Sequence, residues 1–478
     1  MIAREHNRLG ANRSAKARAP QLVARPSTPG LTTTTARPPA DSTPGEGTHR
    51  SEHFIDLSLW RALNVPMFPE GFLWGAATAA HQVEGNNVNS DCWLLEHLPG
   101  SIFAEPSGDA CDHYHRYPED IATLAGLGLN TYRFSVEWAR IEPEEGEFST
   151  AILDHYRRVL TTCQDHGLSP VVTYHHFTSP RWLLAAGGWE DKKTPDRFAR
   201  YCDRVTRHLG DLIGTACTLN ESNLPRLLSS LGVAPPAEER SQQPMWQAAG
   251  KRLGIPPDRV APFQFTGTVE AFDTMLAAHR AGSAAIKAVR ADLPVGWTLA
   301  LADIQAGPGG ENHAARVRRD VNEVYLEASR NDDFVGVQTY SRTRFEADGP
   351  LPPPTGAELN MMGEEFYPEA LEATIRLAAA VSGAPILVTE NGLATSDDTR
   401  RQVYVRRALQ GVTNCLRDGI DVRGYIYWTA LDNFEWVFGY RPTFGLIAVN
   451  RATQARTVKP SARWLGEVAR TNGAALLT

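Results

Sequence analysis

The chain of 478 residues carries a net charge of −7, with 42% hydrophobic and 22% charged residues. This balance is ordinary for a soluble globular enzyme, and it argues against nucleic acid and anionic membrane surfaces as partners. No stretch reaches the ~18–20 consecutive apolar residues that a membrane-spanning helix needs.

The first 52 residues differ in composition from the rest of the chain. They are rich in Pro, Thr, Ala and Arg and nearly free of large apolar side chains. Such a segment buries too little apolar surface to offset the entropy lost on ordering it. We therefore expect a disordered tail over residues 1–52 and a folded domain over residues 53–478.

Cysteine usage and the N-terminal residues indicate a cytoplasmic location. The six cysteines form no C-x-x-C pair, so neither a disulfide-dense scaffold nor a metal knuckle is expected. No apolar run of about 7–15 residues follows the basic residues near the N-terminus, so a secretory signal is not expected.

Eight short runs of apolar and β-branched residues recur through the rest of the chain, and polar residues end each run. Segments with apolar residues three and four positions apart, which are typical of helices, lie between most of the runs. Apolar strands alternating with helices indicate a parallel sheet covered on both faces. Eight such units predict an α/β fold, a (β/α)8 TIM barrel with insertions. An open doubly wound sheet is the competitor, but no G-x-G-x-x-G turn follows the first run. The runs are residues 72–80, 130–136, 170–177, 215–222, 295–301, 334–340, 385–392 and 422–431.

Two of these runs end in a glutamate. Glu221 closes one in "TLNES", and Glu390 closes another in "VTENG". Because the carboxyl ends of barrel strands open onto the active-site face, both carboxylates are expected at the same rim. A carboxylate pair there suits glycoside hydrolysis, in which one acts as acid/base and the other as nucleophile or base. Position alone does not establish this role, since a glutamate at a strand end is more often simply solvated.

Aromatic and hydrogen-bonding side chains gather at the same strand ends. A sugar site needs this mixture, because ring faces require apolar platforms and vicinal hydroxyls require polar partners. Any single aromatic residue is more often core packing, but the whole set favours a sugar site. The aromatic residues are Trp74, Trp138, Phe177, Tyr340, Trp428, Trp436 and Phe444, and the polar residues are Gln82, Arg133, His176, Asn220 and Glu435.

From about Phe68 to the C-terminus, the chain resembles the family 1 glycoside hydrolases of the β-glucosidase type. Six blocks in the family's order carry this resemblance, which makes it far more specific than a lone T-E-N-G. The blocks are "FPEGFLWGAATAAHQVEGN", "GDACDHYHRYPEDI", "GLNTYRFSVEWARIEP", "TLNES", "VTENG" and "YWTALDNFEWVFGYRPTFGL".

The resemblance implies a retaining β-glycosidase that needs no metal and no cofactor. Its substrates would be small β-glycosides or short oligosaccharides with a terminal β-D-glucose, or also fucose or galactose. Glu390 matches the nucleophile and Glu221 the acid/base, with carboxyl groups about 5–5.5 Å apart. Arg133 and Tyr340 match the groups that hold the nucleophile. The positions that match sugar-binding residues are Gln82, His176, Asn220, Trp428, Glu435, Trp436 and Phe444.

The sequence departs from the family pattern at several positions. Ser222 follows the acid/base where proline is usual, and the segment after it does not match the common loop, which leaves the aglycone undefined. Gln338 and Thr339 stand where asparagine and tyrosine are usual, and Phe177 where many members have tryptophan. Glu435 argues against 6-phosphosugar substrates, because a carboxylate would repel their phosphate in a closed site.

Three alternatives stay open at this point. A transglycosidase would use the same covalent intermediate with an alcohol in place of water. A non-catalytic sugar-binding barrel is disfavoured because such relatives generally lose a carboxylate, and both are present here. An unrelated barrel enzyme that uses metal or phosphate is disfavoured because neither a usable His/Asp cluster nor a Gly-rich phosphate loop is found.

Overall fold

The computed structural model describes residues 67–477. The predicted tail over residues 1–52 lies outside the described residues, so that prediction and the domain boundary at residue 53 stay predictions.

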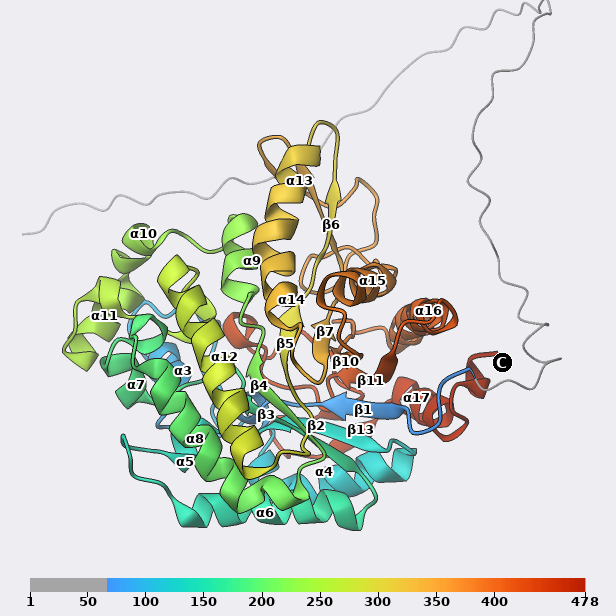
Figure 1. Ribbon diagram of the computed structural model, residues 1–478, viewed down its shortest axis with the longest axis horizontal. Helices are drawn as coiled ribbons and strands as arrows, with labels where there is room; N and C mark the ends of the chain where they lie inside the picture. Colours follow the sequence, from blue (N-terminus) through green and yellow to red (C-terminus); the bar gives the residue numbers. More distant parts are fainter. Residues whose placement is uncertain (1–66, 478) are drawn as a thin grey trace, which may run out of the picture. The chain divides into compact units, whose positions relative to one another are not determined.

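The eight predicted strands form a closed parallel barrel, which confirms the (β/α)8 fold (Figure 1). The order around the barrel is β1, β11, β10, β7, β5, β4, β3 and β2, so strands from the two ends of the chain close the sheet. The strands are β1 (Leu73–Ala77), β2 (Thr131–Ser135), β3 (Ser169–His175), β4 (Thr215–Asn220), β5 (Val295–Ala300), β7 (Val335–Gln338), β10 (Ile386–Glu390) and β11 (Val422–Trp428).

Each strand is buried along nearly its whole length, because the barrel interior covers one face and helices cover the other. Small and medium-sized apolar side chains, among them Ala77, Val171, Cys217, Leu387 and Ile426, pack together as a cluster separate from the main core. Such layers fill the inside of a TIM barrel, which is a packed core rather than a pore.

Long helices follow the strands and lie outside the barrel (Figure 1). Helix α12 packs closely on α8, since a Cβ at Gly282 would lie 2.7 Å from the Phe198 ring. The long helices are α4 (His113–Leu127), α6 (Thr150–Asp165), α8 (Thr194–Leu209), α12 (Val269–Val289), α15 (Ala370–Ser382), α16 (Asp398–Arg417) and α17 (Pro460–Arg470). Helices α13 (Glu311–Arg318) and α14 (Val324–Ala328) flank a π-helical turn at Arg319–Glu323.

Several smaller elements were not predicted from sequence. Two small sheets lie outside the barrel: β6 (Asp303–Ala306), β8 (Arg342–Glu346) and β9 (Gly349–Leu351) form one, and β12 (Ile447–Val449) and β13 (Arg456–Val458) form the other. The short helices are α2 (Ala80–Val83), α3 (Asp91–Glu96), α5 (Trp138–Ile141), α7 (Arg181–Ala185), α9 (Leu224–Ser230), α10 (Ala237–Ser241) and α11 (Pro244–Leu253).

All six cysteines are free and buried. Within residues 67–477, none of the helices combines the length and the apolar character needed to cross a membrane.

Candidate active site

The two glutamates singled out from sequence stand at the carboxyl ends of two barrel strands. Glu390 is the last residue of β10, and Glu221 directly follows β4. The strand register shifts between Cys217 and Asn220 on β4 and between Val388 and Glu390 on β10. Such irregularities re-aim side chains at the rims of barrels.

Glu390 is held by a cation and a phenol. Arg133 on β2 donates from Nη1 to Glu390 Oε1 at 2.5 Å, and the Tyr340 hydroxyl donates to Oε2 at 2.6 Å. The Glu390 residue is only 3% exposed. Burial raises the pKa of Glu390 above its usual value, while Arg133 and Tyr340 oppose that rise because they stabilise the carboxylate.

Glu221 has a different environment. It is 8% exposed, and among the described residues its carboxyl group has no hydrogen-bond partner. Burial raises the pKa of Glu221 well above its usual value, and the negative charges of Glu390 and Glu435 raise it further. Arg133 lowers this pKa but is bonded to Glu390, so Glu221 keeps its proton to higher pH than Glu390 does.

The backbone at the site is strained. Glu221, Phe177 and Trp436 have φ values of +50°, +66° and +49°, in the left-handed region that non-glycine residues rarely adopt. Residues held in this region by their surroundings cluster at active sites and ligand clamps. Phe177 and Glu221 lie just after strands β3 and β4, whereas other left-handed non-glycine residues, among them Asn86, Ala110 and Gln454, lie outside the predicted site residues.

Asn220 directly precedes Glu221, and His176 lies beside Asn220. Arg133 Nη2 donates to Asn220 Oδ1 at 2.6 Å, so one guanidinium joins Asn220 to Glu390. Asn220 Nδ2 lies 3.3 Å from His176 Nε2. Burial lowers the pKa of His176 well below its usual value, so the imidazole is neutral at physiological pH.

Gln82 and Glu435 form a second polar group. Gln82 Nε2 donates to the Phe434 carbonyl at 2.7 Å and lies 3.3 Å from Glu435 Oε2. Burial and the charge of Glu390 raise the pKa of Glu435 to about 8, while bonds from Gln82 and Trp428 oppose the rise. This pair offers both an acceptor and a donor to a bound hydroxyl.

Aromatic rings pack around these polar groups. The His176 ring is stacked on Trp428 and Trp436, with centroids 5.6 Å and 6.2 Å apart, and Phe444 meets Tyr340 edge-on at 5.8 Å. His81, which was not predicted as a site residue, stacks on Trp436 at 5.7 Å. It precedes Gln82 in the first resembling block, which is the signal that could have identified it.

Two aromatic residues predicted at the rim lie elsewhere, and that prediction is wrong. Trp74 is near the amino end of β1, where its indole donates to Asn472 Oδ1 at 3.0 Å and its ring packs on Phe68. Trp138 donates to Glu142 Oε2 at 2.8 Å and stacks on Tyr201 of helix α8. Both are core residues, because the apolar runs alone do not indicate which way or at which height a side chain points.

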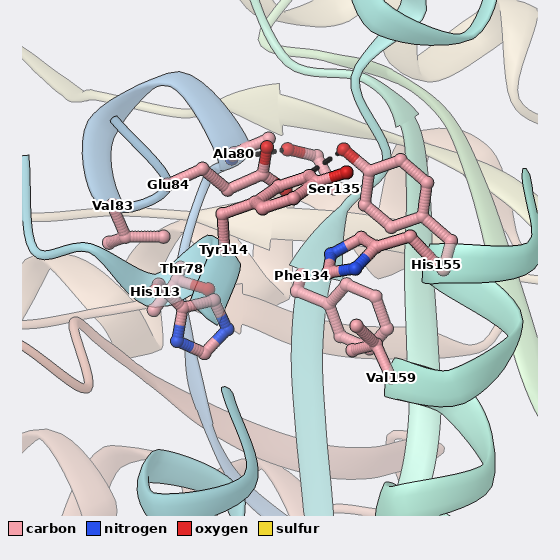
Figure 2. Close-up of a pocket in the computed structure, with 11 residues that line it drawn as sticks. Thr78, Ala80, Val83, Glu84, His113, Tyr114, Phe134, Ser135, His155 and Val159 are labelled. Atoms are coloured by element: carbon pink, nitrogen blue, oxygen red, sulfur yellow. Dashed lines mark hydrogen bonds between the residues drawn. The ribbon is translucent and has the colours of Figure 1, made fainter. Parts of the chain in front are cut away.

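A small cavity lies among α4, β2 and α6, away from the glutamates (Figure 2). Its volume is about 10 Å³, which is enough for one water molecule and far too small for a sugar. Tyr114 and His155 stack on each other at its wall, with ring centroids 3.8 Å apart. None of the predicted site residues lines this cavity, so it is no part of the candidate active site.

Within residues 67–477, no group of three or more His, Cys, Asp or Glu side chains is arranged to hold a metal ion. The rim of this parallel barrel carries two buried glutamates that differ in proton affinity, and aromatic and amide side chains surround them. This arrangement is found in glycoside hydrolases.

Comparison with known proteins agrees with this class. The family model for glycosyl hydrolase family 1 matches residues 65–302 and 327–474. Thermostable beta-glucosidase B of Thermobispora bispora is 33% identical over 444 residues, which cover 85% of this chain and 91% of that protein. The chain belongs to glycosyl hydrolase family 1 and is a glycoside hydrolase.

Solved structures agree with this assignment. The crystal structure of beta-glycosidase BGL167 is 68% identical, with a TM-score of 0.83, and the match covers 84% of this chain and 97% of that one. Beta-glucosidase from Thermotoga maritima in complex with noeuromycin is 27% identical, with a TM-score of 0.74, and the match covers 86% of this chain and 100% of that one.

Proposed function

We propose that this glycoside hydrolase is a retaining β-glycosidase that releases terminal β-D-glucose, and also fucose or galactose, from small β-glycosides or short oligosaccharides. The unequal environment of the two glutamates carries the proposal. Glu390 is bonded to Arg133 and Tyr340, which favour its ionised form, whereas Glu221 has no such partner within residues 67–477 and holds its proton more strongly. The relatives named beta-glucosidase and beta-glycosidase support the same substrate class.

The proposed reaction has two steps. In the first, Glu390 attacks the anomeric carbon while Glu221 protonates the departing glycosidic oxygen, which yields a covalent glycosyl-enzyme and a free alcohol. In the second, Glu221 takes a proton from water as the water displaces Glu390 from the sugar. Because each step inverts the anomeric centre, the product keeps the β configuration.

The remaining predicted residues would bind the sugar. Asn220 would contact the 2-hydroxyl, where hydrogen bonds strengthen as the transition state develops. Gln82 and Glu435 would bind a further pair of hydroxyls. With a pKa of about 8, Glu435 carries the charge that would repel a phosphorylated sugar only at higher pH. His176, Trp428, Trp436 and Phe444 would complete the walls.

A cytoplasmic location forms part of the proposal. The six free, buried cysteines support it.

The direct test is the stereochemistry of hydrolysis. Purified protein is incubated with nitrophenyl β-D-glucoside, β-D-fucoside and β-D-galactoside, and proton NMR follows the first sugar anomer to appear. We expect the β anomer first, with the α anomer growing in only by later mutarotation. If the α anomer appears first, the enzyme inverts, and the assignment of Glu390 as nucleophile is wrong.

The pH profile tests the roles of the two glutamates. Activity needs Glu390 ionised and Glu221 protonated, so kcat/KM should fall at low pH as Glu390 gains a proton and at high pH as Glu221 loses one. In Tyr340→Phe, the hydroxyl that stabilises the Glu390 carboxylate is lost. The pKa of Glu390 should then rise, which moves the acidic limb to higher pH and leaves the basic limb in place. An acidic limb that stays unchanged or moves to lower pH would contradict this assignment.

A further inference from the structure

The carboxamide oxygen of Asn220 accepts hydrogen bonds from three side chains on three other strands. Arg133 Nη2 lies 2.6 Å from Oδ1, Thr298 Oγ1 lies 3.0 Å away, and Gln338 Nε2 lies 3.0 Å away. Arginine and amide NH₂ groups can only donate, so the atom that they surround must be the oxygen. Asn220 therefore directs Nδ2 away from them, toward His176.

Gln338 lies on β7, two strands from β4 in one direction around the barrel, and Arg133 lies on β2, two strands from β4 in the other. Gln338 is the last residue of β7 and pairs with Glu390 on β10 and with Ala300 on β5. Its side chain is almost completely buried, and its Oε1 has no hydrogen-bond partner among the described residues. An unpaired buried acceptor destabilises the fold. Turning the amide over would not relieve this cost, because Oε1 would then face Asn220 Oδ1, acceptor against acceptor.

We propose that Gln338 is a positioning residue that holds the Asn220 carboxamide with its NH₂ group facing the sugar. The inference deepens the proposed function and rests on it, because the contact that Gln338 controls is the one to the 2-hydroxyl of the bound glycoside. Because Oδ1 is bonded to Gln338, Thr298 and Arg133, the Asn220 carboxamide can neither flip to exchange its oxygen and nitrogen nor rotate away from this orientation. Hydrogen bonds to the 2-hydroxyl strengthen in the transition state, so the orientation of this amide affects the rate more than substrate binding.

The test compares two substrates in the Gln338→Met variant. Methionine has nearly the length and volume of glutamine but cannot donate a hydrogen bond. We expect kcat/KM for nitrophenyl β-D-glucoside to fall by about tenfold or more, with most of the loss in kcat, as suits a weakened transition-state contact. The corresponding 2-deoxyglucoside lacks the hydroxyl that Asn220 binds, so its kcat/KM should change by no more than about twofold.

Thr339→Val is the matched control. Thr339 is the next residue along the chain, but its hydroxyl bonds to the Leu301 carbonyl and to Thr374 on α15, on the side of the sheet away from Asn220. Any effect of this isosteric change should be equal for the two substrates. Gln338→Leu provides a second apolar replacement if the methionine variant folds poorly, and thermal melting monitors the fold of each protein.

The outcomes separate the two proposals. A wild-type protein that hydrolyses no β-glycoside would overturn the proposed function itself. If the wild type is active and Gln338→Met lowers kcat/KM by the same factor for both substrates, Gln338 only maintains the fold. Unchanged kinetics on both substrates would remove it from the site altogether. Only a loss confined to the substrate with a 2-hydroxyl supports the inference.

Discussion

Replacing Glu390 with alanine should lower kcat on nitrophenyl β-D-glucoside by several orders of magnitude, because no covalent intermediate can form without the attacking carboxylate. The rest of the site should survive the change. Arg133 keeps its bond to Asn220, and Tyr340 still packs on Phe444. Stopped assays at high enzyme concentration, with active-site titration of the wild type, measure the loss.

Azide gives the Glu390→Ala variant a distinctive product. The anion can occupy the space left by the carboxylate and attack from the same face, while Glu221 still protonates the leaving group. We expect partial recovery of activity and an inverted α-glycosyl azide, identified by NMR. A β-glycosyl azide from this variant would show that Glu221 is the nucleophile and Glu390 the acid/base. Glu358→Ala is the matched control, since Glu358 is an exposed glutamate paired with Arg400 and should leave kcat within about twofold.

Replacing Glu221 with alanine should have a comparably large effect, but one that depends on the leaving group. Loss of the general acid matters most when the departing oxygen is strongly basic. The rate of hydrolysis of an alkyl or sugar β-glucoside should fall by several orders of magnitude. A dinitrophenyl β-glucoside needs little protonation of its leaving group, so its rate of glycosyl-enzyme formation should fall far less. Rapid-quench kinetics should show a burst of dinitrophenol followed by slow turnover, because deglycosylation now lacks its base.

Two further measurements test this role of Glu221. Azide needs no base, so it should accelerate turnover of the dinitrophenyl substrate and yield a β-glycosyl azide, with retained configuration. The basic limb of the pH profile should also disappear, because the pKa of Glu221, raised by burial and by the charge of Glu390, sets that limb in the wild type. An unaltered basic limb in Glu221→Ala, or an equal loss for all leaving groups, would assign the acid to another residue.

The eight strands were predictable because each is buried on both faces and therefore forms an unbroken apolar run. The two glutamates stood out for the same reason: in "TLNES" and "VTENG" a charged residue interrupts such a run where a barrel strand should end. Helix boundaries are less apparent from sequence. The pattern of apolar residues does not mark where α12 begins, which is at Val269, where the Thr268 hydroxyl accepts a hydrogen bond from Ala271 N. The strands of the outer sheets are short and partly polar, and their partners are distant in sequence, so no local pattern indicated them.

The sequence by itself determined the class of fold, the two glutamates at strand ends and, through the resemblance of six ordered blocks, the family. Only the tertiary structure decided which polar groups meet. Arg133 bonds both to Glu390, 257 positions away, and to Asn220, 87 positions away, and Gln338 reaches Asn220 over 118 positions. The tertiary structure also shows that Trp74 and Trp138 are core residues and not part of the site. The reason is geometric: an apolar run records that a strand is buried, whereas closure of the barrel sets which strand ends face each other and at what height each side chain lies.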